Sequence, residues 1–316
     1  MSSYAAAGVN LAAADENVRR IGAHVRSTHG PHVLGDFGAF AGLFHLTDIK
    51  DPVLVASTDG VGSKVLLGIQ LGAFELLGQD LVNLSVNDVL TTGARPLFFL
   101  DYVGLHALEH DVMERLVAGM ARACRENGCA LLGGETAQLP ELYAPGHFDL
   151  VGTVVGVVER ARLIDGARVQ PGDRVWGLPS HGLHTNGYTL ARRVLSDPAH
   201  LGMLMTPHPS YYPTMAPLLE RVKAIAHITG GGIPGNLSRV LPAHVSAELD
   251  AGSWPVPRIF EVLQEAGGLA DDEMLRVFNM GLGLIFVADP RERFSEAIEV
   301  GRVVERSDQR VVIRGR

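Results

Sequence analysis

Hydrophobic residues along the first half of the chain gather in short runs that alternate with longer amphipathic stretches. Short runs of Val, Leu and Phe bounded by turn residues are typical of buried strands. The sequence predicts such strands at 52–57, 96–104, 129–134 and 149–159. Between them, apolar residues at helical spacing predict helices from about Phe74 to Thr92 and from about His110 to Glu126.

The second half follows a turn-rich join at 161–175, where Asp-Gly and Pro-Gly-Asp steps favour turns. A strand is predicted at 175–178, another within 278–287, and a last one at the end of the chain. Strands and helices alternate irregularly, so we expect a mixed α/β (α+β) fold rather than one doubly wound sheet. The 316 residues allow two cores, and the predicted domains are residues 1–162 and 163–316.

Composition then narrows the class of protein. Hydrophobic residues make up 47% and charged residues 20%, which indicates a soluble globular protein. The net charge of −8 argues against a nucleic-acid partner, and no apolar run reaches the length needed to cross a membrane. The only cysteines are Cys124 and Cys129, which we interpret as core thiols of a cytoplasmic protein.

The stretch STDGVGSK, residues 57–64, has the parts of a phosphate-binding loop but does not match the Walker pattern. Gly60 and Gly62 would let backbone N–H groups approach an anion, and Lys64 would supply a point charge for a phosphate. Asp59 cannot bind phosphate directly, but it can hold Mg²⁺ that does. Lysine occurs elsewhere only at positions 50 and 223, so Lys64 is interpreted as chosen for its shape. The alternative is a tight turn with exposed charges.

The helix that follows carries a polar line of Asp80, Asn83 and Asn87 on an otherwise apolar surface, and Asp88 comes next. Because buried polar groups need partners, either a structural hydrogen-bond network or a bound ligand would satisfy them. Asn87 is taken as a candidate nucleotide contact, and Asp88 as a candidate metal ligand.

A third acidic position, Glu135, follows Gly134 in LLGGETAQLPELY. Like Asp59, it adjoins glycines at the end of a predicted strand. Asp59, Asp88 and Glu135 are therefore predicted to converge on one Mg²⁺–nucleotide pocket.

In the second half, His184 and Asn186 lie at a predicted helix start, which favours contact with a phosphate or substrate. A surface histidine is the alternative. A zinc pair of His181 and His184 is not favoured, because no further ligand follows at the usual spacing. The triple glycine Gly230–Gly232 again joins a strand to a helix, a form that suits anion binding.

Read in order, seven stretches resemble the successive motifs of the aminoimidazole ribonucleotide synthetase family, also called phosphoribosylformylglycinamidine cyclo-ligases. They are SYAAAGVN, STDGVGSK, VNDVLTTGARPLFFLDY, LLGGETAQLPELY, GLHTNGYTLAR, ITGGGIPGNLSRVLP and FNMGLG. The resemblance implies an enzyme that uses ATP and Mg²⁺ to close the imidazole ring of a ribonucleotide in purine biosynthesis. It also implies a homodimer in which N-terminal strands of both subunits form a barrel, and a C-terminal α/β sandwich-like domain that completes the substrate cleft.

By motif position, the resemblance gives catalytic, metal and nucleotide roles to the residues singled out above. The catalytic candidates are Lys64, His184 and Asn186. The metal candidates are Asp59, Asp88 and Glu135. The nucleotide-binding candidates are Asp59, Gly60, Gly62, Ser63, Lys64, Asn87, Gly134, Gly230, Gly231 and Gly232.

Two positions depart from the family pattern: Ala6 replaces a usual lysine, and Asp36 stands where glycine is more common. They leave open a nucleotide-binding regulator without turnover. The enzymatic alternative is a phosphotransferase of the thiamin monophosphate kinase type, which would not be expected to carry GGGIPGN with FNMGLG.

Overall fold

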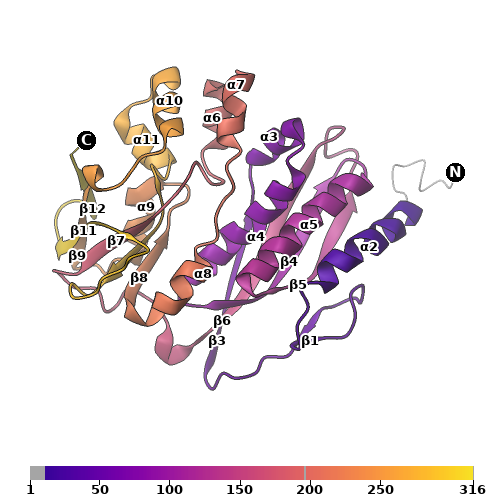
Figure 1. Cartoon of the computed structure of the whole chain (residues 1–316), viewed down its shortest axis with the longest axis horizontal. Helices are drawn as coiled ribbons and strands as arrows, with labels where there is room; N and C mark the ends of the chain where they lie inside the picture. Colours follow the sequence, from indigo (N-terminus) through magenta and orange to yellow (C-terminus); the bar gives the residue numbers. More distant parts are fainter. Residues whose placement is uncertain (1–10, 196, 316) are drawn as a thin grey trace. The chain divides into compact units, whose positions relative to one another are not determined.

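The computed structural model describes residues 11–195 and 197–315, and the chain divides into two compact units (Figure 1). The described residues up to Glu159 form the first unit, except Leu90–Ala94, which pack with the second unit. The second unit continues from Arg160 onward. Both units combine strands and helices, so the predicted mixed α/β class is confirmed. Among the described residues, no helix combines the length and apolar character needed to cross a bilayer.

A four-stranded sheet forms the centre of the first unit. Its order is β3 (Pro52–Gly60), β6 (Phe148–Glu159), β4 (Arg95–Leu105) and β5 (Ala130–Gln138). Only β4 and β5 run parallel, and α5 (His110–Asn127) connects them. A short hairpin, β1 (Val33–Leu34) with β2 (Leu43–Phe44), precedes the sheet.

Helices cover one face of this sheet, as Figure 1 shows. They are α2 (Leu11–Arg26), α3 (Lys64–Leu71), α4 (Phe74–Leu90) and α5. In α5 the buried residues Met113, Leu116, Val117 and Met120 recur three or four apart, which places one apolar stripe against the core. The helix ends at Gly128, whose φ of 68° is the left-handed conformation that terminates helices.

No described helix covers the other face of the sheet, and the side chains on this face remain half-buried or exposed. Strand pairing defines two rows on this face: Ala56, Val155 and Phe98 form one, and Thr58, Thr153 and Leu100 form the next. Leu54 at the edge of the sheet is 64% exposed. We call this surface the bare sheet face, defined by Leu54, Ala56, Thr58, Val151, Thr153, Val155, Phe98, Leu100 and Tyr102.

A six-stranded sheet organises the second unit, in the order β12-β9-β11-β7-β10-β8. Its strands are β7 (Arg174–Pro179), β8 (Val222–His227), β9 (Val245–Asp250), β10 (Leu282–Ala288), β11 (Ile298–Glu305) and β12 (Val311–Arg314). All neighbouring pairs are antiparallel except β12 with β9. Every residue of β10 is buried, which makes this strand the centre of the core.

Short helices connect the strands of the second unit. They are α6 (Tyr188–Val194), α7 (Pro198–Leu204), α8 (Tyr212–Met215), α9 (Gly232–Val240), α10 (Arg258–Gly267) and α11 (Asp271–Val277). Short 3₁₀ helices occur at Arg160–Arg162, Ala216–Arg221 and Ala251–Ser253. Leu90 packs into the hydrophobic core of this unit with Trp176 and Phe286.

Most predicted strands and helices are confirmed, but several boundaries differ; the strand predicted at 129–134, for example, is Ala130–Gln138. The predicted strand at 52–57 extends to Gly60, so Ser57–Gly60 are part of β3 and not of a loop. The connection to α3 is therefore only Val61–Ser63. Cys124 and Cys129 are both buried, as predicted. Ala6 lies outside the described residues.

Candidate functional site

Asp59 and Asp88 lie on the same side of the sheet, and Ser57 connects their positions. Asp59 is near the end of β3, and its Oδ1 accepts a hydrogen bond of 2.7 Å from the backbone N–H of Gly60. Two residues earlier on the same face of the strand, Ser57 donates from Oγ to Oδ2 of Asp88 over 2.9 Å. The end of β3 and the last turns of α4 thus bring two of the three predicted carboxylates to one side of the sheet.

Glu135 does not join them within the described chain, and this part of the predicted convergence is wrong. Register places Asp59, Gly152, Asp101 and Gly134 in one row across the four strands. Glu135 is the next residue of β5 and pairs with Tyr102, so alternation places it on the opposite face. Three interstrand spacings, about 14 Å, also separate β5 from β3.

Lys64 is buried, which corrects the expectation of an exposed lysine that lines phosphates. It is the first residue of α3, its side chain is 0% exposed, and its Nζ lies 2.6 Å from Oδ2 of Asp80. Asp80, on α4, is equally inaccessible. Burial lowers the pKa of Lys64, and the neighbouring Asp80 acts in the opposite direction. A lysine held in this way joins two helices and is not presented to a ligand.

At least two of the polar side chains along α4, those of Asp80 and Asn83, form contacts within the chain. Asp80 belongs to the ion pair with Lys64, and Asn83 accepts a 3.0 Å hydrogen bond from the side-chain amide of Asn127 on α5. Asn87 is also buried. Contacts within the chain therefore satisfy Asp80 and Asn83 without a bound ligand. A contact of Asn87 with a nucleotide stays a prediction.

The candidates of the second unit lie on loops that meet beyond β7 and β8. His184 and Asn186 belong to the turn before α6, and Gly230–Gly232 connect β8 to α9. A Cβ placed on Gly230 would lie 3.5 Å from Oδ1 of Asn186, so these two turns are in contact. His184 is buried and has a φ of 62°, a conformation that residues other than glycine rarely adopt.

Asp101 is a candidate that the sequence interpretation missed. It lies on β4 beside Gly134 and lines a cavity of about 270 Å³ between α2, α5 and β5. Burial raises its pKa to about 7, while its own backbone hydrogen bond acts the other way. Asn17 on α2 also lines the cavity, and its buried amide oxygen has no hydrogen-bond partner among the described residues. The available signal was a single carboxylate within the otherwise apolar run PLFFLDYVG.

Comparison with protein families covers both units. The family model described as AIR synthase related protein, N-terminal domain, matches residues 39–158, and the corresponding C-terminal domain model matches residues 170–314. The chain belongs to the AIR synthase related family. The first model matches mainly within the first unit, and the second matches within the second unit.

Relatives within the family agree over nearly the full length. The chain is 47% identical to the phosphoribosylformylglycinamidine cyclo-ligase of Myxococcus xanthus, over 96% of either chain. It is 44% identical to the protein of the same name from Symbiobacterium thermophilum, over 99% of this chain and 98% of the relative. The resemblance stated from the motifs is therefore confirmed.

Solved structures of proteins with other names have a fold similar to that of this chain. Thiamine-monophosphate kinase from Stenotrophomonas maltophilia K279a has a TM-score of 0.70 at 21% identity, covering 94% of this chain and 95% of the kinase. Hydrogenase maturation protein HypE in complex with ATP has a TM-score of 0.68 at 20% identity, covering 92% and 88%. At these identities the likeness shows the fold alone.

The buried ion pair of Lys64 and Asp80 predicts how single and double variants change the free energy of unfolding. Lys64→Met leaves the Asp80 carboxylate buried without its cation, so we expect the free energy of unfolding to fall by about 3–5 kcal/mol. The double variant Lys64→Met, Asp80→Leu removes both charges and should recover most of that loss. Urea unfolding of the wild type, both single variants and the double variant measures the coupling. A loss below about 1 kcal/mol in Lys64→Met would contradict the pair's structural role.

Asp101 predicts how stability depends on pH. Its pKa in the folded chain, about 7, is above the ordinary 3.8, so the folded state binds the proton more tightly. The resulting stabilisation is complete below the ordinary pKa and is lost as the pH rises through about 7. Asp101→Asn mimics the protonated acid and should therefore lose less stability than the wild type between about pH 5 and about pH 8. Equal losses, measured by urea unfolding, would show that Asp101 does not titrate in this range.

Proposed function

We propose that this chain catalyses the ATP-dependent closure of formylglycinamidine ribonucleotide to aminoimidazole ribonucleotide, with ADP and phosphate as the other products. The reaction belongs to de novo purine biosynthesis. The observation that carries the proposal is the identity of 44–47% to cyclo-ligases over nearly their full length. Motifs from both units contribute to that agreement, so it concerns the whole two-domain enzyme. A cytoplasmic location stays a prediction.

The proposed chemistry has two steps. The amide oxygen of the substrate takes the γ-phosphoryl group of ATP, and a nitrogen of the same substrate then attacks the activated carbon and displaces phosphate. Charge develops on the phosphoryl oxygens, so the site needs positive or N–H groups directed at them. The turns at Gly60–Gly62 and Gly230–Gly232 are our candidates for backbone donors, with Asn186 beside the second turn.

Mg²⁺ fits the carboxylates at the end of β3. Asp59 is exposed, and Ser57 connects its position with that of Asp88, which gives two oxygen donors of the kind this ion prefers. We propose that Asp59 and Asp88 hold Mg²⁺, which would neutralise the charge of the nucleotide phosphates. Glu135 would need a different role, because it lies on the opposite face of the sheet.

A thiamin monophosphate kinase activity is less well supported. The kinase from Stenotrophomonas maltophilia shares the fold at 21% identity, whereas the cyclo-ligase of Myxococcus xanthus shares 47% of its sequence. A regulator without turnover is the other alternative, and the assay below separates both from the proposed enzyme.

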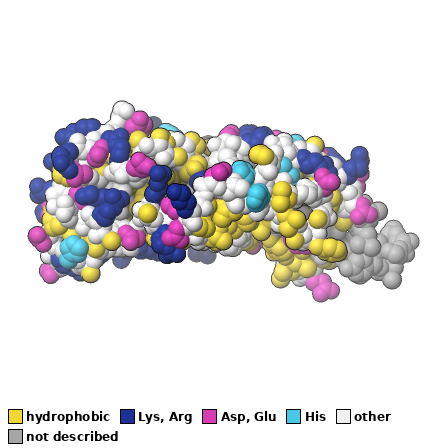
Figure 2. All heavy atoms as spheres, turned by 90° about the horizontal axis from the view of Figure 1, so that it is seen from below, with side chains coloured by type: hydrophobic (Ala, Val, Ile, Leu, Met, Phe, Trp, Pro, Cys, Tyr) yellow, Lys and Arg dark blue, Asp and Glu magenta, His cyan; other side chains and the backbone are white. Residues whose placement is uncertain are grey.

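We also propose that two copies of the chain pair through the bare sheet face. Among the described residues no helix covers its apolar side chains, although Phe98 packs against Phe44 of β2, and Figure 2 shows hydrophobic side chains gathered on one part of the surface. Phe40 and Leu43 in the segment before β3 are also exposed. Monomeric proteins rarely leave contiguous apolar patches of this kind in water. A second copy would cover the face and allow the shared barrel that the family resemblance implies.

The enzyme assay uses formylglycinamidine ribonucleotide, ATP and Mg²⁺, and measures both ADP and aminoimidazole ribonucleotide. Asp59→Asn should lower turnover by about 10²-fold or more, because the loss of a metal-binding charge weakens transition-state stabilisation. Asp149→Asn is the matched control: Asp149 is also exposed near a strand end and accepts a 2.9 Å hydrogen bond from the next backbone N–H. It should keep nearly full activity. Phosphorylation of thiamin monophosphate without ring closure would overturn the proposal.

The assembly prediction is tested by light scattering at micromolar concentration. The wild type should have twice the chain mass of 33.8 kDa. Leu54→Glu places a charge on the bare sheet face and should shift the protein toward the monomer, because burying an unpaired charge is costly. Leu71→Glu, at an exposed position on α3 where a helix covers the sheet, should remain dimeric. A monomeric wild type would refute the dimer.

A further inference from the structure

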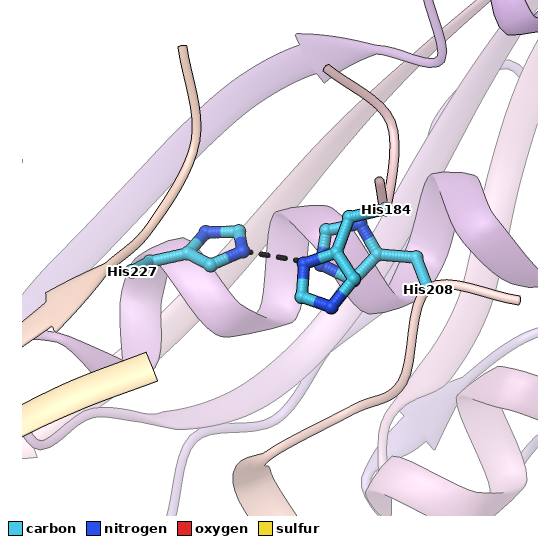
Figure 3. A group of neighbouring side chains, drawn as sticks. All are labelled: His184, His208 and His227. Carbon is cyan, nitrogen blue, oxygen red and sulfur yellow. Dashed lines mark hydrogen bonds between the residues drawn. The ribbon is translucent and has the colours of Figure 1, made fainter. Parts of the chain in front are cut away.

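Three histidines that are distant in sequence meet in the second unit. His184 lies in the turn before α6, His208 lies between α7 and α8, and His227 is the last residue of β8. Their side chains are buried, with exposures of 1%, 0% and 5%. One ring nitrogen from each lies within 4.8 Å of the other two. Figure 3 shows the imidazole of His227 directed toward the stacked pair of His184 and His208.

Hydrogen bonds define which ring atoms carry protons. Nε2 of His208 and Nε2 of His227 are 3.1 Å apart, so one of them must accept, and at least one of these two rings is neutral. The Tyr211 hydroxyl donates to the carbonyl of Pro179 over 3.0 Å. Its oxygen therefore accepts from Nε2–H of His184, at 3.2 Å. Neutral His184 consequently has its lone pair on Nδ1.

The backbone around the cluster is adapted to hold these rings. His184 has a φ of 62°, and such a conformation is retained only where the surroundings hold it in place. A Cβ on Gly283 would overlap the Tyr211 hydroxyl and the ring of His184, so only glycine leaves room for both. The rings of His184 and His208 stack with centroids 4.2 Å apart.

We propose that this histidine cluster binds a divalent transition-metal ion of the Zn²⁺ class. The ligands would be Nε2 of His208, Nε2 of His227 and Nδ1 of His184, with water in the fourth position. Tetrahedral zinc with bonds of about 2.0–2.1 Å separates its ligand nitrogens by about 3.3 Å. The His208–His227 pair, at 3.1 Å, already has nearly this spacing, and one ring nitrogen of His184 lies within 4.8 Å of a ring nitrogen of each.

Outer hydrogen bonds support the same assignment. When His208 binds through Nε2, its proton moves to Nδ1, where Oγ1 of Thr185 lies 3.2 Å away and can accept it. His184 would keep its proton on Nε2, bonded to Tyr211. Metal-bound histidines in proteins characteristically donate their second N–H to such a neighbour, which fixes the ring orientation.

The cluster selects a different class of ion from the proposed nucleotide site. Mg²⁺ takes oxygen ligands and keeps much of its water, so three buried imidazoles do not suit it. Imidazole nitrogen suits Zn²⁺, Co²⁺, Ni²⁺ and Cu²⁺. His184 is also one of the catalytic candidates, but Zn²⁺ binding and ring closure are measured separately, so the two proposals can fail separately.

The direct test is metal binding by the full chain after treatment with a chelator. Zn²⁺ affinity is measured by competition with a chromophoric chelator after prolonged incubation, and Co²⁺ reports geometry through its visible absorption. We expect one equivalent of Zn²⁺ to bind, and intense Co²⁺ bands of a tetrahedral site. His208→Ala should lower the affinity by about 10²-fold or more. His244→Ala, which removes an exposed histidine of the same unit, should leave it unchanged.

A second variant keeps the test decisive if His208→Ala does not fold. Thr185→Val retains all three rings and removes only the outer acceptor, so we expect affinity to fall by about 10-fold with the tetrahedral Co²⁺ spectrum preserved. The proposal is overturned if the wild type binds no Zn²⁺ after prolonged incubation. Equal affinity of the wild type and His208→Ala, or of the wild type and Thr185→Val, would also overturn it.

Discussion

The ion pair of Lys64 with Asp80 is the contact on which the architecture of the first unit's candidate site depends. It joins the first residue of α3 to the middle of α4, with both side chains out of contact with water. The short connection Val61–Ser63 is thereby held between β3 and a fixed helix end. Two buried charges in contact are favourable only while both are present, because each alone would be left in a medium of low polarity. The sequence uses one of its three lysines for this purpose.

The two faces of the four-stranded sheet have different roles in the proposed function. The helix-covered face buries Phe99 and Val154 and carries Asp59 and Asp101 in the next row. Both carboxylates are thus placed by strands that the core holds rigid. The bare sheet face has the complementary task in our proposal, since its uncovered apolar side chains would meet a second copy. In this proposal, strand alternation would place catalysis and assembly on opposite sides of the same four strands.

The sequence allowed most of this fold to be predicted, because buried strands and amphipathic helices leave clear periodic patterns. Lys64 could not be placed, since a glycine-rich turn followed by lysine looks the same whether the side chain points inward or outward. Glu135 was misplaced because the face of a strand residue depends on register, and β5 shifts register against β4 between Phe99 and Leu100. The histidine cluster has no local pattern at all, because its members come from three separate segments of the chain.

A crystal structure with Mg²⁺ and a non-hydrolysable ATP analogue tests the central claim most directly. The claim is that Asp59 and Asp88 serve the metal–nucleotide site while Lys64 serves the fold. We expect Mg²⁺ within bonding distance of Asp59 and Asp88, about 2.0–2.1 Å, and Nζ of Lys64 still on Asp80. Lys64 on a phosphate oxygen, with Asp80 released and the metal bound elsewhere, would contradict the account.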